Sequence, residues 1–157
     1  PLSYLVAIAA HETAHQWFYG VVGNDPAIQP WLDEALATYS ELLYYQRYFP
    51  EFADGWWTFR VDTYNPAGWV DSTIYDHGSF RPYVNAVYLR GAGFLRDLRG
   101  AIGDEVFFEF LKDYAERGRE QNPGSLATGE LFFEVLSEHT DQDISNLSQE
   151  YFKNPNP

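Results

Sequence analysis

The stretch His11-Glu12-Thr13-Ala14-His15, followed after eighteen further residues by Glu34, carries the strongest signal in this chain. On a helix, side chains four residues apart lie on the same face. His11 and His15 can therefore direct two imidazoles at one metal ion, while Glu12 lies beside that ion. Glu34 is the carboxylate that can complete the ligand set. The stretch predicts a metal site that the rest of the fold supports.

Zinc is the metal that these ligand types favour, because it accepts imidazole nitrogen and carboxylate oxygen. Three protein ligands leave a fourth position for water, as in catalytic zinc sites. Such a water has a pKa near ~7, and Glu12 could take its proton during attack on a carbonyl and pass it to the leaving amine. The alternative is a chance H-E-x-x-H match, expected in roughly one chain in a few hundred of this length.

The composition is typical of one globular domain with a sizeable core. The chain has 157 residues, of which 45% are hydrophobic and 18% are aromatic. Its formal charge of −13 argues against a nucleic-acid partner, because binding phosphates needs clustered Lys and Arg. The longest aliphatic run is too short to span a bilayer. Nothing in the sequence indicates an oligomeric state.

The chain contains no cysteine, which excludes disulfides and thiolate metal sites. It contains no methionine either and starts at Pro1, shortly before the metal-site helix, so we expect a fragment of a longer protein. A Cys-free chain rich in Trp and Tyr is compatible with a place outside the cytoplasm, which we favour. A cytosolic enzyme could have the same composition, so the compartment stays open.

Hydrophobic periodicity and helix breakers predict an all-α domain of about six or seven helices. The first should run from Ser3 to about Tyr19 and be buried on most sides, and the second should cover residues 31–48. The further expected helices are 50–59, 82–101, one from residue 103 to about 116, one that Thr128 caps, and one that Asp143 caps. Residues 64–80 are expected to form a long ordered loop.

The predicted domain covers residues 1–152, and residues 153–157 are expected to be a disordered tail. The two remaining histidines carry less weight than the motif pair. His77 is expected to be an ordinary loop residue. His139 is expected to be a favourable cation at the negative end of a helix.

Several segments resemble the gluzincin zinc peptidases of the aminopeptidase N type. The segments that carry the resemblance are His11-Glu12-x-x-His15-Gln16-Trp17-Phe18, Trp31-Leu32-Asp33-Glu34-Ala35-Leu36-Ala37-Thr38-Tyr39-x-Glu41, Tyr88-Leu89-Arg90-Gly91-Ala92 and Leu98-Arg99-x-x-Ile102-Gly103-Asp104-Glu105-x-Phe107. The resemblance implies that this chain is the helical portion of a thermolysin-like catalytic domain, from the C-terminal half of that domain. It also implies peptide or protein substrates.

The resemblance implies that His11, His15 and Glu34 bind Zn²⁺ and that Glu12 is the general base. It implies that the Tyr88 phenol donates a hydrogen bond to the developing oxyanion, which would lower the barrier by ~3 kcal/mol. Without the resemblance, Tyr88 would be read as a core aromatic residue. Tyr83 is a weaker candidate for a place beside the site.

Three features depart from the family pattern. Asp33 stands where the family often has Asn, Ala35 where Gly is usual, and Arg90 where Lys is usual. The family's Gly-x-Met-Glu-Asn strand, whose Glu holds the substrate α-amine, has no counterpart in this chain. A looser peptidase-MA-like relative, a non-peptidase zinc hydrolase and a degenerate binding domain therefore stay open beside the aminopeptidase.

Overall fold

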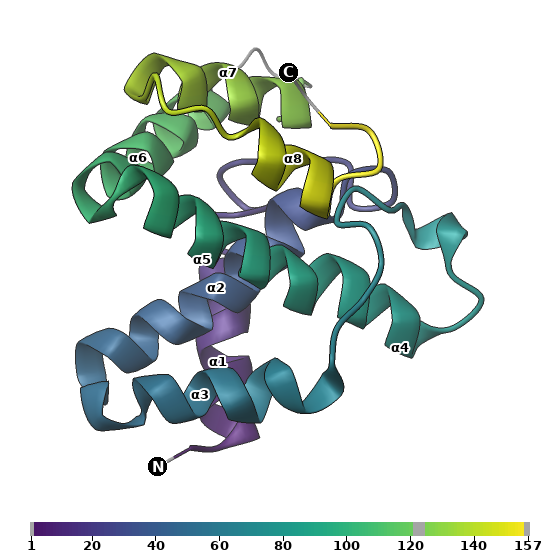
Figure 1. The fold of residues 1–157 in the computed structure, drawn as a ribbon, viewed down its shortest axis with the longest axis vertical. Helices are drawn as coiled ribbons and strands as arrows, with labels where there is room; N and C mark the ends of the chain where they lie inside the picture. The colour runs from purple at the N-terminus through teal and green to yellow at the C-terminus, as the bar shows by residue number, and fades with distance from the viewer. Residues whose placement is uncertain (1, 121–124, 156–157) are drawn as a thin grey trace.

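The computed structural model describes residues 2–120 and 125–155. These residues fold into helices and short turns, without a β-sheet (Figure 1). The elements are α1 (Tyr4–Ala14), α2 (Trp31–Tyr48), α3 (Ala53–Arg60), α4 (Phe80–Tyr83), a π-helical segment η4 (Val84–Arg90), α5 (Gly91–Ile102), α6 (Asp104–Glu120), α7 (Gly129–His139) and α8 (Ser145–Tyr151). Because α4, η4 and α5 follow one another without a break, the described part contains seven helices, which confirms the predicted all-α fold.

Helix α2 is the element around which the others pack. Pro30 precedes it, Asp33 and Glu34 lie in its first turn beside the positive end of the helix dipole, and Pro50 follows its end. The predicted bounds of this helix are confirmed to the residue. Helices α1, α3 and α5 and the segment η4 all contact α2, so side chains from four elements meet along it.

Helix α1 is shorter than the sequence predicts. The Ser3 hydroxyl accepts a hydrogen bond from the Leu5 N–H (3.2 Å), as expected for an N-cap, but the helix ends at Ala14 and not near Tyr19. After Ala14 the chain forms successive turns, and Tyr19 has a φ of 107°. These turns bring Val22 into the core, where it is 1% exposed, which a continued straight helix could not do.

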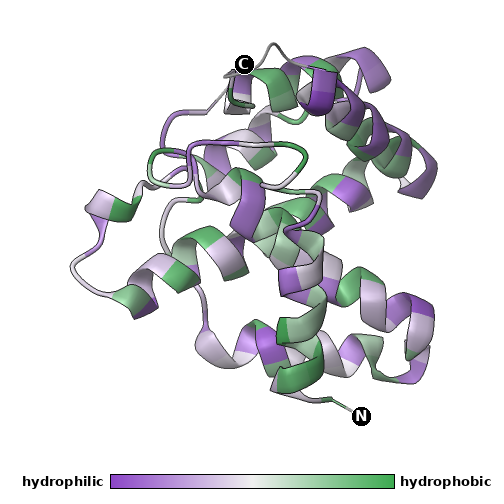
Figure 2. Cartoon of the chain, turned by 180° about the vertical axis from the view of Figure 1, so that it is seen from behind, coloured by the Kyte–Doolittle hydropathy of each residue, from purple (hydrophilic) through white to green (hydrophobic). Residues whose placement is uncertain are grey.

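The outer face of α1 is exposed to solvent, although the helix was expected to be buried on most sides. Leu5 is 79% exposed and Ile8 is 49% exposed, and Figure 2 shows the turns of α1 beside the N-terminus as largely hydrophobic. A groove of about 600 Å³, which Leu5 lines but Ile8 does not, runs between α1 and α2. None of the helices in the described ranges is long and apolar enough to cross a membrane.

An aromatic cluster forms the core between α2, α5, α7 and the end of α8. The Trp31 ring lies 5.0–6.3 Å, centroid to centroid, from four phenylalanine rings, and the five members of the cluster are Trp31, Phe94, Phe132, Phe133 and Phe152. Most of these contacts are edge-to-face, the geometry that aromatic quadrupoles favour. Thr128 caps α7 as predicted, accepting a hydrogen bond from the Leu131 N–H (3.3 Å).

The connecting segments differ from expectation in two places. Helix α6 continues to Glu120, beyond its expected end at about residue 116, and residues 121–124 lie outside the described ranges. At the C-terminus, the backbone N–H groups of Lys153 and Asn154 donate to the Asp71 carboxylate (2.8 and 2.9 Å). The beginning of the expected tail thus has a fixed place against the long loop, while residues 156–157 lie outside the described part.

Candidate metal centre

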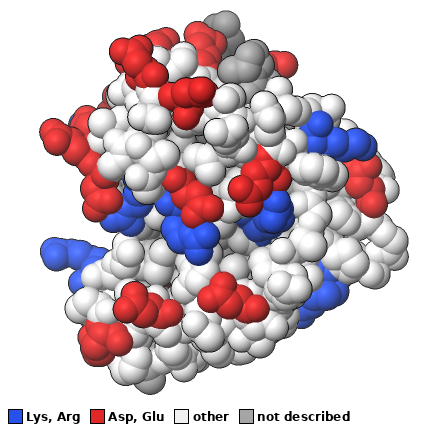
Figure 3. Space-filling view, viewed as in Figure 1, with Lys and Arg blue, Asp and Glu red and all other residues white. Residues whose placement is uncertain are grey.

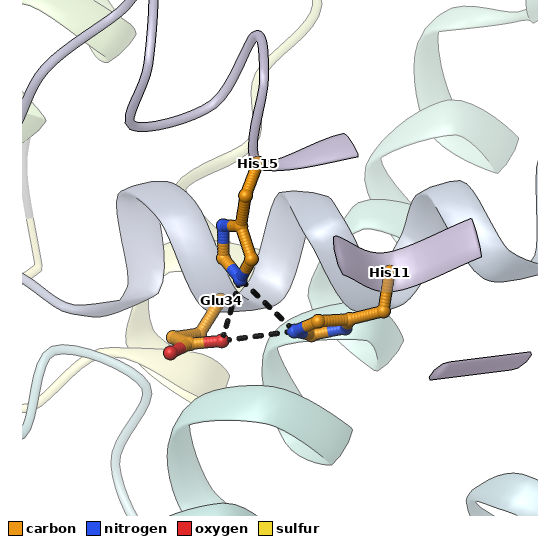
Figure 4. A group of neighbouring side chains, drawn as sticks. All are labelled: His11, His15 and Glu34. Atoms are coloured by element: carbon orange, nitrogen blue, oxygen red, sulfur yellow. Dashed lines mark hydrogen bonds and ion pairs between the residues drawn. The ribbon is translucent and has the colours of Figure 1, made fainter. Parts of the chain in front are cut away.

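His11, His15 and Glu34 bring three ligand atoms to one point, as the sequence predicts (Figure 4). The His11 Nε2 atom lies 3.1 Å from Glu34 Oε2 and 3.1 Å from His15 Nε2, and His15 Nε2 lies 3.4 Å from Glu34 Oε2. His11 lies in the last turn of α1, His15 directly follows that helix, and Glu34 lies in the first turn of α2. The close packing of α1 against α2 therefore assembles the group.

The orientation of the His11 ring is set from its other nitrogen. His11 Nδ1 donates to Glu41 Oε1 (3.1 Å), and Glu41 is fully buried. Arg60 in α3 binds both oxygens of the same carboxylate, through Nε at 2.9 Å and Nη2 at 3.0 Å. Glu34, His11, Glu41 and Arg60 thus form an ionic chain across three helices. Partners of this kind fix the ring and the tautomer of a metal-binding histidine.

Neither Glu41 nor Arg60 has a role that was predicted from the sequence. A signal for Glu41 exists in the sequence, since it lies seven residues after Glu34 and therefore on the same face of α2. Arg60 is nineteen residues further along and lies in another helix, so no local pattern connects it to the site.

The second imidazole is held in the same way, by a backbone group. His15 Nδ1 donates to the Phe18 carbonyl oxygen (3.1 Å). This bond depends on the turns that replace the last predicted part of α1. Carboxylate and carbonyl oxygens only accept hydrogen bonds, so both imidazoles carry a hydrogen on Nδ1. In the neutral tautomers each Nε2 then presents a lone pair to the centre of the group.

The donor set fits a zinc ion. Two Nε2 lone pairs and a Glu34 oxygen would repel one another at 3.1–3.4 Å unless a proton or a metal cation lies among them. Tetrahedral zinc, with ligands at about 2.0–2.1 Å, places its ligand atoms ~3.3 Å apart. The three spacings in this chain match that value, and three protein ligands leave a position open for water or substrate.

The ionisation of the group also favours a positive charge at its centre. Burial opposes protonation of His11, but hydrogen bonds to Glu34 and Glu41 outweigh burial and raise its pKa to about 9. Burial would raise the pKa of Glu34, yet its hydrogen bonds to His11, His15 and Tyr88 lower that pKa to about 2. Glu34 is therefore an anion over the whole physiological range.

Tyr88 and Glu12 lie in the same cavity as the three candidate ligands. The cavity has a volume of about 450 Å³, and both side chains line it. The Tyr88 ring stacks on the His11 ring, with centroids 5.8 Å apart and ring planes within 1°. Burial, and then the neighbouring Glu34 carboxylate, raise the pKa of Tyr88, so its hydroxyl keeps its proton and can donate. Glu12 is exposed to solvent within this cavity.

The π-helical segment η4 presents Tyr88 to the site. Tyr83 lies five residues earlier, and its ring centroid is 5.6 Å from that of Tyr88. Burial, together with the charges of Glu34 and Asp33, raises the pKa of Tyr83 to about 12. Tyr83, expected as a weaker candidate for a place beside the site, makes an edge-to-face ring contact with Tyr88.

The other two histidines lie outside the metal group. His77 lies in the loop, with its ring 5.8 Å from that of Tyr83. His139 lies at the end of α7, as expected, and its Nε2 is 3.1 Å from Asp113 Oδ2 in α6. His139 thus links two helices in addition to its favourable place at a helix end.

Comparisons with known proteins agree with this geometry. Residues 3–151 match the Peptidase family M1 domain. The chain is 27% identical over 158 residues to "Probable aminopeptidase 1" of Sulfurisphaera tokodaii, covering 95% of this chain and 20% of that protein. It is also 27% identical over 162 residues to "Aminopeptidase N" of Lactobacillus helveticus, covering 96% of this chain and 19% of that protein. The chain thus spans about a fifth of the length of these relatives.

Solved structures give the same result. The M1 zinc metallopeptidase from Deinococcus radiodurans matches with a TM-score of 0.62 and 27% identity, covering 85% of this chain and 29% of that one. A variant of the same enzyme, solved with a Tyr-Ser-Ala substrate, matches with a TM-score of 0.66 and 26% identity, over the same shares of the two chains. From the family match and the shared fold, this chain belongs to peptidase family M1, as an aminopeptidase N-like gluzincin fragment.

Proposed function

We propose that this chain carries the catalytic centre of a zinc-dependent peptidase, with aminopeptidase action as its subtype. The observation that supports this proposal best is the convergence of three acceptor atoms, from His11, His15 and Glu34, beside two groups suited to proton transfer and oxyanion binding. On this proposal, residues 1–152 are the helical part of the catalytic domain.

Each side chain then has a defined task. His11, His15 and Glu34 would hold the zinc ion, which when bound supplies a Lewis acid that makes water more acidic. Glu12 accepts the proton of the attacking water and delivers it to the leaving amine. The Tyr88 hydroxyl, which keeps its proton, donates to the oxygen on which negative charge develops. Glu41 keeps the His11 ring in place and its lone pair directed at the centre.

The variant Glu12→Gln tests the proposal directly. The amide keeps the size of the side chain but cannot take a proton, so peptide hydrolysis should fall at least about a thousandfold while about one zinc per chain remains bound. Zinc content is measured by elemental analysis, and hydrolysis with short peptides. Full activity in the variant would exclude Glu12 as the base, and a wild-type protein that takes up no zinc would exclude the proposed centre.

The subtype is tested with pairs of substrates that differ only at the N-terminus. An aminopeptidase should cleave peptides with a free α-amine and leave their acetylated forms intact. The names of the curated relatives support this subtype. Equal cleavage of both forms would identify an endopeptidase, and cleavage of esters in place of peptides would identify a different zinc hydrolase.

A further inference from the structure

The cavity of the metal group extends along one face of α1 toward its N-terminus. Tyr4, Ile8, His11 and His15 all line it, at spacings of three to four residues. Tyr4 lies seven residues before His11, which corresponds to ~10 Å along a helix that rises about 1.5 Å per residue. An extended peptide covers about 3.3–3.6 Å per residue, so this distance corresponds to roughly three residues of a bound chain.

Two arginines line the same cavity, and they differ in what they contact. Both nitrogens of Arg60 that face Glu41 are engaged with its carboxylate. Arg81 is exposed and forms no ion pair with any acidic side chain in the described ranges. Its contact is with the Tyr64 ring, 4.6 Å from guanidinium carbon to ring centroid. Arg81 is therefore the cation of this cavity that is free to pair with a ligand.

The position of Arg81 within the cavity follows from its aromatic partner. The Tyr64 hydroxyl lies 2.6 Å from the Tyr4 hydroxyl, so the pair marks the end of the cavity that is remote from the metal group. Stacking on Tyr64 leaves the edge of the guanidinium plane available, and that edge binds a carboxylate through two parallel hydrogen bonds. The chain as a whole carries a charge of −13, and Arg81 lines the same cavity as Glu12 and Glu34 without an ion pair to either of them.

We propose that Arg81 is a specificity residue that binds a carboxylate on about the third residue of the peptide substrate, counting the residue held at the metal group as the first. This inference rests on the proposed peptidase function. The carboxylate is either the free C-terminus of a short peptide or an Asp or Glu side chain of a longer one. In both cases the Arg81 guanidinium supplies the positive charge that binds the carboxylate. The distance along α1 determines which residue of the peptide carries that carboxylate.

The test is a binding experiment on the intact, zinc-loaded protein in the Glu12→Gln background, so that bound peptides are not consumed. Calorimetry compares trialanine, trialanine amide and Ala-Ala-Asp amide, before and after Arg81→Ala. We expect both carboxylate-bearing ligands to bind about tenfold more tightly than trialanine amide, as for hydrogen bonds between charged groups. Arg81→Ala should abolish that preference, and Arg81→Lys should retain part of it.

Arg47 offers the matched control, because it is an exposed arginine in α2 that does not line this cavity. Arg47→Ala should leave the preference unchanged. Absence of any preference for carboxylates, or of any peptide binding, would overturn the proposal. An equal loss for all three ligands in Arg81→Ala would also overturn it, since Arg81 would then act only by packing on Tyr64.

The result of this binding test can be distinguished from the result of the test of peptidase activity. If the protein with intact Glu12 hydrolyses no peptide, the peptidase proposal fails, whereas the carboxylate preference is still measured by binding alone. If hydrolysis occurs, Arg81→Ala should raise KM for trialanine by a similar factor and leave kcat unchanged. The values for trialanine amide should not change.

Discussion

The two buried regions that meet along α2 are held together by different forces. The aromatic cluster around Trp31 is neutral and packs ring against ring. The ionic chain of Glu34, His11, Glu41 and Arg60 consists of charged or hydrogen-bonding groups whose atoms lie 2.9–3.1 Å apart. In Figure 1 the first region lies toward α7 and α8, and the second lies where α1 and α3 approach α2.

This difference shows which region stabilises the fold and which serves the site. Burying aromatic surface contributes free energy in proportion to the area removed from water. Burying charges costs several kcal/mol per ion, which ion pairing only offsets, so a buried ion pair is weak evidence for stability. We infer that the aromatic cluster stabilises the fold, whereas the ionic chain is retained because it fixes His11. Four predictions test this contrast.

The largest effect is expected for Phe132→Ala. Phe132 is fully buried and touches Trp31, Phe110 and Tyr114, so the variant should lose about 3–5 kcal/mol in free energy of unfolding. Urea denaturation should show the same loss with and without zinc, because the cluster contains no metal ligand. Phe108→Ala is the control, since Phe108 is 40% exposed. A loss below about 1 kcal/mol for Phe132→Ala would contradict the inference that the aromatic cluster stabilises the fold.

The second prediction concerns the buried Glu41–Arg60 pair. Glu41→Ala leaves Arg60 and His11 without their acceptor and should cost about 3 kcal/mol in zinc-free protein. Adding Arg60→Ala should cost far less in that background than it does alone, because the two side chains act as one unit. A double-mutant cycle measures this coupling, which should exceed about 1 kcal/mol. Strictly additive losses would show that the pair is not coupled.

The third prediction separates positioning from stability. Glu41→Gln keeps an acceptor for His11 Nδ1 but removes the charge, so zinc affinity should fall about tenfold to a hundredfold. Competition with a chelator measures the affinity. Glu51→Gln, at an exposed position, and Phe132→Ala should both leave zinc affinity unchanged. If Phe132→Ala weakened zinc binding as much as Glu41→Gln, the two regions would not be independent.

The smallest effect is expected for the surface contacts of Asp113, which link α6 to His139 in α7. The hydrogen bond from His139, and then that from Arg117, lower the pKa of Asp113 below its ordinary value of 3.8. A lowered pKa means that the contribution is present above the unfolded pKa and is lost as pH falls through the folded pKa. Asp113→Asn should therefore flatten the acid limb of the stability curve, by less than ~1 kcal/mol. Urea denaturation at pH 5 and pH 3 measures this, and an unchanged slope would contradict it.

The charges on the surface follow a pattern of their own. On the face seen in Figure 3, Lys and Arg side chains lie in a band across the middle of the molecule, flanked by Asp and Glu. A hollow of about 330 Å³ between α2, α3 and α5 contains Arg96 and Arg99. Arg96 pairs with Asp97 and Arg99 pairs with Asp104, so the charges of both arginines are already balanced.

Sequence patterns predicted the elements whose limits are set by local chemistry. The bounds of α2 follow from Pro30 and Pro50, and the three candidate ligands follow from the spacing of the motif. The end of α1 could not be predicted in this way. Gly20 was the visible breaker, but the helix ends at Ala14, and the chain then turns so that Phe18 offers its carbonyl to His15.

The parts of the site that could not be predicted from the sequence depend on contacts between distant segments. Glu41 could have been found from its place on the same face of α2 as Glu34, but Arg60 reaches Glu41 from another helix. The place of Arg81 on the Tyr64 ring also exists only in the folded chain. Periodicity identifies a helix and its buried face, but it does not identify which side chain of another helix will contact that face.

The π-helical segment Val84–Arg90 makes the site depend on how one helical stretch is wound. In an α-helix, residues five apart point about 140° away from each other, yet the wider turn here brings the rings of Tyr83 and Tyr88 to 5.6 Å. With ordinary α-helical winding, two residues share one face when they are four apart, about 40° from each other, so Val84–Arg90 has the geometry of an α-helix with one residue inserted. Substitutions that return Val84–Arg90 to α-helical winding without removing a residue should therefore turn Tyr88 away from Tyr83, whereas removal of one residue should keep the two rings on one face.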